Sequence, residues 1–129
     1  MAKVKISVGR IVLHVDLYAT PTAQAVLAAA PFESRVTLWP GEIYFQAPLR
    51  AGREDDAREV VEPGEIAFRP EGEVIIIGYG PTPCSEAEEI RFASRANVWG
   101  RSGDDLTRLA ALEGGELVRV EPVVEVEPA

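Results

Sequence analysis

Cys84 and His14 are the residues whose types could do nucleophilic chemistry, and the chain has one cysteine and one histidine. A cysteine nucleophile needs a nearby base, and His14 is the only histidine that could serve. His14 alternates with apolar neighbours and is in phase with Asp16, so we expect it on the exposed face of a strand rather than beside Cys84. One cysteine, one histidine and scattered acids also lack the spacing of a metal site. We therefore expect no metal, no cofactor and no cysteine-based catalysis.

Cys84 belongs to the segment GYGPTPCSEAEEIR, from Gly78 to Arg91, which has two interpretations. Pro81 and Pro83 have no backbone N–H and would end the preceding strand. The segment SEAE has the pattern of a capping box, in which Ser85 starts a helical turn and Glu88 bonds back to it. The segment would then be a turn with solvated acids. The alternative is a rigid binding loop at the rim of the fold.

Aromatic residues at strand positions are the stronger indication of a site, and two interpretations stay open for them. Large side chains of this kind usually fill a barrel. Some of them could instead form the walls of a rim pocket, with a few polar residues orienting a ligand. The residues that we expect to line such a pocket are Tyr18, Thr20, Trp39, Glu42, Tyr44, Phe68, Arg69, Tyr79, Thr82, Ser85 and Asn97.

Glu42 is the most informative polar residue of this set. It shares a strand face with Tyr44, and an acid buried among aromatic side chains is costly unless it is paired. Arg69 and Arg91 are the cations that we expect could pair with it.

The local pattern predicts strands with two short helices. Apolar residues alternate over residues 2–8 and 11–18, which predicts a hairpin that turns at Gly9. Thr20 and Pro21 are an N-cap and a first helical residue, which predicts a helix over Pro21–Ala30. A second short helix is expected over Asp104–Leu112, capped by Ser102 or Asp104 and ended by glycines.

The rest of the chain alternates between short strands and turns. Residues 36–39 and 42–46 predict a second hairpin, and residues 74–79 predict a central strand. Two further strands, at 90–93 and 97–101, should flank a loop. The last strand should carry valines 118, 120, 124 and 126 in one phase, with a bulge or an edge at Pro122. Together these elements predict one mainly β domain over residues 1–129, an antiparallel barrel or sandwich.

Four segments together resemble a prokaryotic family of uncharacterised cyclophilin-like domains, and the likeness runs from about Ile6 to Val120. They are YATPTA from Tyr18, WPGEIYF from Trp39, VEPGEIAFRP from Val61 and GPTPCSE from Gly80. The resemblance implies a closed antiparallel cyclophilin-like β-barrel with two short capping helices.

True cyclophilins are peptidyl-prolyl isomerases, and the resemblance implies that such activity needs an arginine on the active face. The comparable segment here, WPGEIYFQA, contains Glu42 and Gln46 but no arginine. Arg69, at the end of another strand, is the candidate substitute.

Composition limits the partners. The chain has 13 Lys and Arg against 21 Asp and Glu, a net charge of −8, without the cationic cluster that nucleic acids or anionic membranes require. No apolar run is long enough to span a membrane, and the N-terminus lacks a signal-peptide pattern, so we expect a cytoplasmic protein. Our leading hypothesis is a domain that binds an unknown small molecule or peptide in the aromatic rim pocket. A weak prolyl isomerase and a structural or homo-oligomeric component without a ligand are the alternatives.

Overall fold

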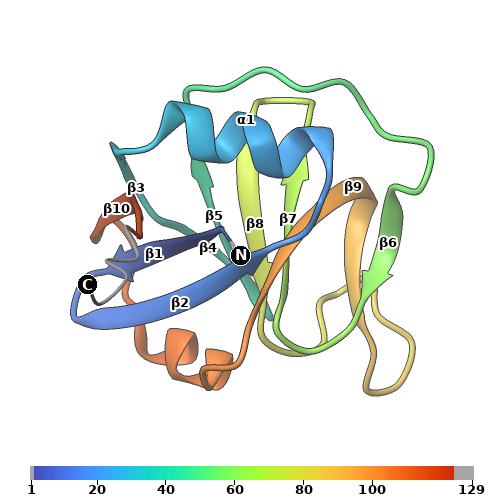
Figure 1. Cartoon of the computed structure of the whole chain (residues 1–129). Coiled ribbons are helices and arrows are strands. Elements are labelled where there is room, and N and C mark those ends of the chain that lie inside the picture. Colours follow the sequence, from blue (N-terminus) through green and yellow to red (C-terminus); the bar gives the residue numbers. More distant parts are fainter. Residues whose placement is uncertain (1, 124–129) are drawn as a thin grey trace.

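The computed structural model describes residues 2–123, which form a nearly closed antiparallel β-barrel with one short helix near each end (Figure 1). This confirms the predicted fold class. The strands are β1 (Lys3–Val8), β2 (Ile11–Leu17), β3 (Phe32–Arg35), β4 (Thr37–Trp39), β5 (Glu42–Gln46), β6 (Arg58–Val61), β7 (Glu65–Arg69), β8 (Val74–Gly78), β9 (Ile90–Ser102) and β10 (Leu117–Pro122). The helices are α1 (Pro21–Ala29) and the 3₁₀ helix η1 (Leu106–Ala111).

The way the barrel closes positions the candidate site. The strand order is β3-β10-β1-β2-β9-β7-β8-β5-β4, with β6 paired separately to β9. The two end strands, β3 and β4, are consecutive in the chain and joined through Val36. Because β4 pairs with β5 while β3 pairs with β10, the chain changes partners at Val36. The barrel therefore has a fork between β3 and the upper end of β5.

Alternation along the strands separates an inner core from an outer cluster. Phe45, Phe68 and Trp99 are fully or almost fully buried inside the barrel with the inward aliphatic residues. Val74, Ile76 and Ala67 point outward and are covered by side chains of β9. Aromatic residues thus fill the barrel, as one of the two interpretations expected.

β9 differs from the prediction because it is one strand of 13 residues rather than two strands around a loop. Its first part pairs with β6, and its second part pairs with β7 and β2. A long strand that pairs with different strands along its length has a burial pattern that changes partway, which resembles two separate strands in the sequence. In place of the predicted loop between residues 93 and 97, the strand continues and has a register shift against β6 between Arg91 and Ala96.

The helix signals were correct for α1 and partly correct for η1. The Thr20 hydroxyl accepts a hydrogen bond from the Ala23 N–H at 3.1 Å, and Pro21 is the first helical residue. The second helix is a 3₁₀ helix whose cap is Asp105, not Ser102 or Asp104. No helix within residues 2–123 has the length and apolar character needed to cross a membrane.

The segment after β8 contains turns instead of the predicted capping box. The Ser85 hydroxyl accepts hydrogen bonds from the N–H groups of Thr82 (2.9 Å) and Arg91 (3.2 Å). Ser85 therefore ties the loop to the start of β9 and does not begin a helical turn. Glu89, not Glu88, bonds back, accepting from the Glu86 N–H at 2.9 Å.

Three smaller expectations have definite outcomes. His14 is exposed, as predicted, and its Nδ1 lies 3.3 Å from the Asp104 carboxylate. Pro122 is the final residue of β10 and lies beyond the residues that pair with β3, so it is paired on the β1 side alone, at a local edge as expected. Positions 124 and 126 lie outside the described residues.

Candidate functional site

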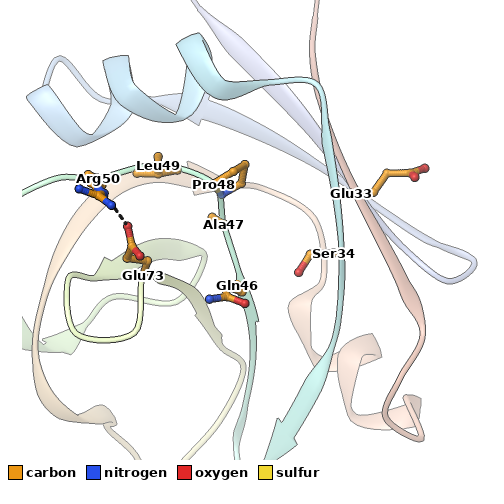
Figure 2. Close-up of a pocket in the computed structure, with 8 residues that line it drawn as sticks. All are labelled: Glu33, Ser34, Gln46, Ala47, Pro48, Leu49, Arg50 and Glu73. Carbon is orange, nitrogen blue, oxygen red and sulfur yellow. Dashed lines mark ion pairs between the residues drawn. The ribbon is translucent and has the colours of Figure 1, made fainter.

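The fork between β3 and β5 contains a cavity of about 450 Å³ (Figure 2). Ser34 points to the inner side of β3 and yet is partly exposed, since the barrel wall is open beside it. Gln46 is the last residue of β5 and lies across the fork from Ser34. The cavity is lined by Glu33, Ser34, Gln46, Ala47, Pro48, Leu49, Arg50 and Glu73.

A second cavity, of about 510 Å³, adjoins the first and shares Ser34 and Gln46 with it. Its other lining residues are Arg35, Thr37, Tyr44 and Val74. We call the two cavities together the seam cleft. Tyr44 is the one residue of the predicted rim pocket that lines it. No local sequence pattern predicted that β3 and β5 would separate here.

Charges at the rim of the seam cleft balance one another. Arg50 Nε lies 3.7 Å from a Glu73 carboxylate oxygen, an ion pair that Figure 2 also shows. On the β3 side, Glu33 points away from the cleft (Figure 2) and lies 3.3 Å from Arg119. Arg35 donates a hydrogen bond to the Gly115 carbonyl at 3.1 Å. The cleft therefore presents no strong field of either sign.

Glu42 is at the other end of β5, on the same outward face as Tyr44. Its side chain is 7% exposed, and its Oε2 has no hydrogen-bond partner among the described residues. Burial raises the pKa of Glu42 to about 7, against a smaller lowering by the charge of Arg69. A carboxyl with such a pKa can hold or release a proton near neutral pH.

The expectation that Arg69 or Arg91 forms an ion pair with Glu42 was wrong. Arg69 Nε donates to the backbone carbonyl of Glu71 at 2.8 Å. Arg91 Nε donates to the Glu89 carboxylate at 2.6 Å. Each arginine is held by an acceptor close to it in sequence, and within residues 2–123 Glu42 has no ion-pair partner.

Glu65 is a buried acid that the sequence reasoning missed. Both its carboxylate oxygens accept hydrogen bonds from Arg58 at 2.9 Å, and the Tyr18 hydroxyl donates to it at 2.9 Å. Burial on its own would raise the pKa of Glu65, but the bonds from Arg58, the Glu62 N–H and Tyr18 outweigh it and lower the pKa. In the segment EIAFR the alternation of a strand places Glu65 on the same face as Ala67. This alternation could have indicated from the sequence that Glu65 is buried.

The other predicted pocket residues lie outside the two cavities of the seam cleft. Asn97 is buried beneath α1 and donates to Thr22 and to the Gly52 carbonyl. Phe68 is 0% exposed in the core. Tyr79 lines a cavity of about 330 Å³ near η1. Trp39 and Glu42 form a facing pair of β4 and β5, so the strip from Trp39 through Glu42 to Tyr44 is brought together as expected. Thr82 and Ser85 are also in contact, within the loop after β8.

Two kinds of comparison with known proteins find relatives. The family described as cyclophilin-like matches residues 2–121. A hypothetical protein of Archaeoglobus fulgidus, solved in solution, is 32% identical, with a TM-score of 0.79 and 93% of each chain covered. McbB, solved in complex with tryptophan, has a TM-score of 0.70 at 16% identity, covering 98% of this chain and 46% of McbB. No curated protein matches the chain.

Proposed function

The chain belongs to the cyclophilin-like family, and we propose that it is a binding domain that holds a small molecule or peptide in the seam cleft. The observation that carries this proposal is the opening in the barrel wall between Ser34 and Gln46, with cavities of about 450 and 510 Å³ on its two sides. These volumes are in the range of small-ligand pockets, about 300–1,000 Å³.

The lining has the mixed character of a binding site. Ala47, Pro48 and Leu49 supply apolar surface on one side, and Tyr44 supplies an aromatic ring on the other. Gln46, which lines both cavities, can donate and accept hydrogen bonds. A few polar groups among apolar ones are what orients a small ligand.

This proposal moves the site from the aromatic rim predicted from sequence to the upper end of β5. Tyr44 belongs to both versions, while Trp39 and Glu42 lie further along the same face. In both versions of the site, the outward face of β5 forms one side of it. Because McbB was solved in complex with tryptophan, tryptophan and other indoles belong in the first set of compounds to test.

The test is a thermal-shift screen of the whole chain with indoles, amino acids and short peptides. A ligand present at 100 times its Kd should stabilise the protein by about 2.7 kcal/mol. Gln46→Trp should abolish the shift, since the side chain of Gln46 is exposed between the two cavities and a larger one would fill them. Val12→Trp is the matched control, because Val12 is an exposed strand residue on β2.

Three outcomes are informative. A shift that Gln46→Trp removes and Val12→Trp keeps supports the seam cleft. A shift that both variants keep places the ligand elsewhere and contradicts the proposal. A thorough screen without any shift favours the structural or oligomeric alternative. Prolyl isomerisation of a test peptide, which takes tens of seconds uncatalysed, would show whether bound peptides are also turned over.

A further inference from the structure

Resting on the proposed function, we infer that the ligand is an aromatic amine, whose ring lies in the outer cavity of the seam cleft and whose ammonium group pairs with the Glu42 carboxylate. The outer cavity is the one of about 510 Å³ that Tyr44 lines. The fold buries Glu42 on the same face of β5 as Tyr44 and, within residues 2–123, gives its Oε2 no hydrogen-bond partner.

The burial of Glu42 is a cost that no contact within the described chain offsets. Glu42 is 7% exposed, and Arg69 and Arg91 donate to acceptors other than its carboxylate. Burying an unpaired acid is unfavourable, and groups kept in such a state cluster at functional sites. A ligand that carries a positive charge and donates a hydrogen bond would satisfy the carboxylate.

Aromatic and apolar side chains surround Glu42 on the outer face of β5. Trp39 of β4 faces it, and Tyr44 follows it two residues along on the same face. On the other side Glu42 is opposite Gly78, where an added Cβ would be 2.4 Å from Ile90 Cγ2, so Ile90 packs closely over this position. A cation that pairs with Glu42 therefore lies beside two aromatic side chains, which attract cations through their π-systems.

The outer cavity adjoins this strip of side chains. Thr37 and Tyr44 face each other in the row next to that of Trp39 and Glu42, and both line the cavity. Neighbouring rows on one face are two residues apart along each strand, which is about 7 Å. An aromatic ring beside Tyr44, joined by a short aliphatic chain to an ammonium group, spans this distance. Trp39 and Tyr44 are each half-buried, so part of both side chains is free to contact the ligand.

The surroundings of Glu42 favour an ammonium group over a metal ion. Hard metal ions need several oxygen ligands, and no group of three or more His, Cys, Asp or Glu side chains within residues 2–123 is arranged to hold one. A negatively charged ligand would be repelled. Burial raises the pKa of Glu42 to about 7, against a smaller lowering by the charge of Arg69. The carboxylate is therefore largely ionised at pH 8 and can accept from an ammonium group.

Matched pairs of compounds test the inference on the whole chain. The probes are phenylethylamine, phenylpropylamine and tryptamine, each compared with its N-acetyl form, which keeps the ring and the chain and loses the charge. Isothermal titration calorimetry at pH 8 measures Kd. We expect the amines to bind about tenfold more tightly than the N-acetyl forms, the effect of one charge-assisted hydrogen bond. Glu42→Gln should remove this difference by weakening the binding of the amines alone.

Three further variants separate the charge of Glu42 from its surroundings. Glu88→Gln removes the same charge from the exposed loop after β8 and should leave the preference for the amines in place. Trp39→Leu should weaken the binding of the amines about two- to fivefold more than that of the N-acetyl forms. Gln46→Trp should block both forms, because it fills the cavity that holds the ring.

Melting curves separate lost binding from lost folding. Glu42→Gln removes an unpaired buried charge, so at pH 8 it should melt at or above the temperature of the unchanged protein while it binds the amines more weakly. A side chain with a merely structural role would not give this combination. Circular dichroism verifies that the other variants are folded.

The outcomes distinguish this inference from the proposed function. If both forms bind equally and Glu42→Gln changes neither, while Gln46→Trp blocks both, the seam cleft is a binding site and the amine inference is wrong. If amine binding depends on Glu42 but survives Gln46→Trp, Glu42 binds amines, and the proposed function and the placement of the ring are wrong. If no amine binds at millimolar concentration, the inference fails, and the thermal-shift screen decides the seam cleft separately.

Discussion

Glu42 and Glu65 lie two strands apart on the outer face of one sheet, on β5 and β7, with β8 between them. Glu42 is opposite Gly78, and the β7–β8 register brings Glu65 to the same level. A side chain at Gly78 would collide with Ile90, whose Cγ2 would be 2.4 Å from the added Cβ. Both acids therefore border the same apolar contact, and they are 7% and 5% exposed.

Their electrostatic surroundings are nevertheless opposite. Glu65 accepts two bonds from Arg58 and one from Tyr18, and its pKa is lowered. Glu42 has an oxygen without a partner in the described part of the chain, and burial raises its pKa to about 7. Burial by itself is therefore a poor guide to the state of an acid, because its partners determine which form is stable.

The largest effect is expected when the cluster of Glu65, Arg58 and Tyr18, which we call the Glu65 cluster, loses its charge. Glu65→Gln keeps the shape of the side chain but leaves the Arg58 guanidinium without its anion and removes a charged acceptor from Tyr18. We expect a loss of about 3 kcal/mol in the free energy of unfolding, measured with urea at pH 7. A loss below about 1 kcal/mol would show that Arg58, which is part exposed, finds water or another acid instead.

At Glu42 we expect the corresponding substitution to raise the free energy of unfolding at high pH instead of lowering it. Folding raises the pKa of Glu42 from 4.5 to about 7, so the folded state favours the protonated form. Its contribution to stability is fully present below pH 4.5 and is lost as the pH rises through about 7. Glu42→Gln, which is neutral at every pH, should therefore be more stable than the unchanged protein by about 2 kcal/mol at pH 8.

The pH profile of this variant supplies its own control. Near pH 4.5 the difference between Glu42→Gln and the unchanged protein should be small, because Glu42 is then protonated in the folded state. A gain that is the same at both pH values would mean that the carboxyl is not the cause. Urea titrations at four or five pH values between 4.5 and 8 resolve the profile.

A smaller effect is expected at the neutral end of the Glu65 cluster. Tyr18→Phe removes the hydroxyl that donates to Glu65 at 2.9 Å and leaves the two Arg58 bonds in place. We expect a loss of about 1 kcal/mol. If Tyr18→Phe costs as much as Glu65→Gln, the three side chains act as one unit, and the double variant would show strong non-additivity.

The smallest effect is expected in the loop beside Glu42. Cys84 is exposed, and Cys84→Ser keeps its size, so the free energy of unfolding should change by less than about 0.5 kcal/mol. Ligand binding should be unchanged as well. A specific loss of binding or of a chemical activity would mean that the segment from Gly78 to Arg91 is a functional loop after all.

Much of the fold follows from local pattern. Alternation in the first two strands, the glycine at their turn, and Thr20 and Pro21 at the start of α1 each predicted an element that the structure contains. The candidate site could be predicted from the sequence only in small part. Tyr44 was named because aromatic residues often line pockets, but Ser34 and Gln46 have no unusual local pattern, and their importance comes from the fork between them.

The sequence by itself determined that this chain forms short alternating strands and that Glu42 shares a strand face with Tyr44. These are properties of one strand at a time, fixed by a period of two. The tertiary structure alone decided that the chain changes partners at Val36, which opens the seam cleft. It also decided that Arg58 meets Glu65 while Arg69 and Arg91 bond elsewhere. The reason is that pairing depends on register and on which strands cross, and neither is encoded in the residue types of a single strand.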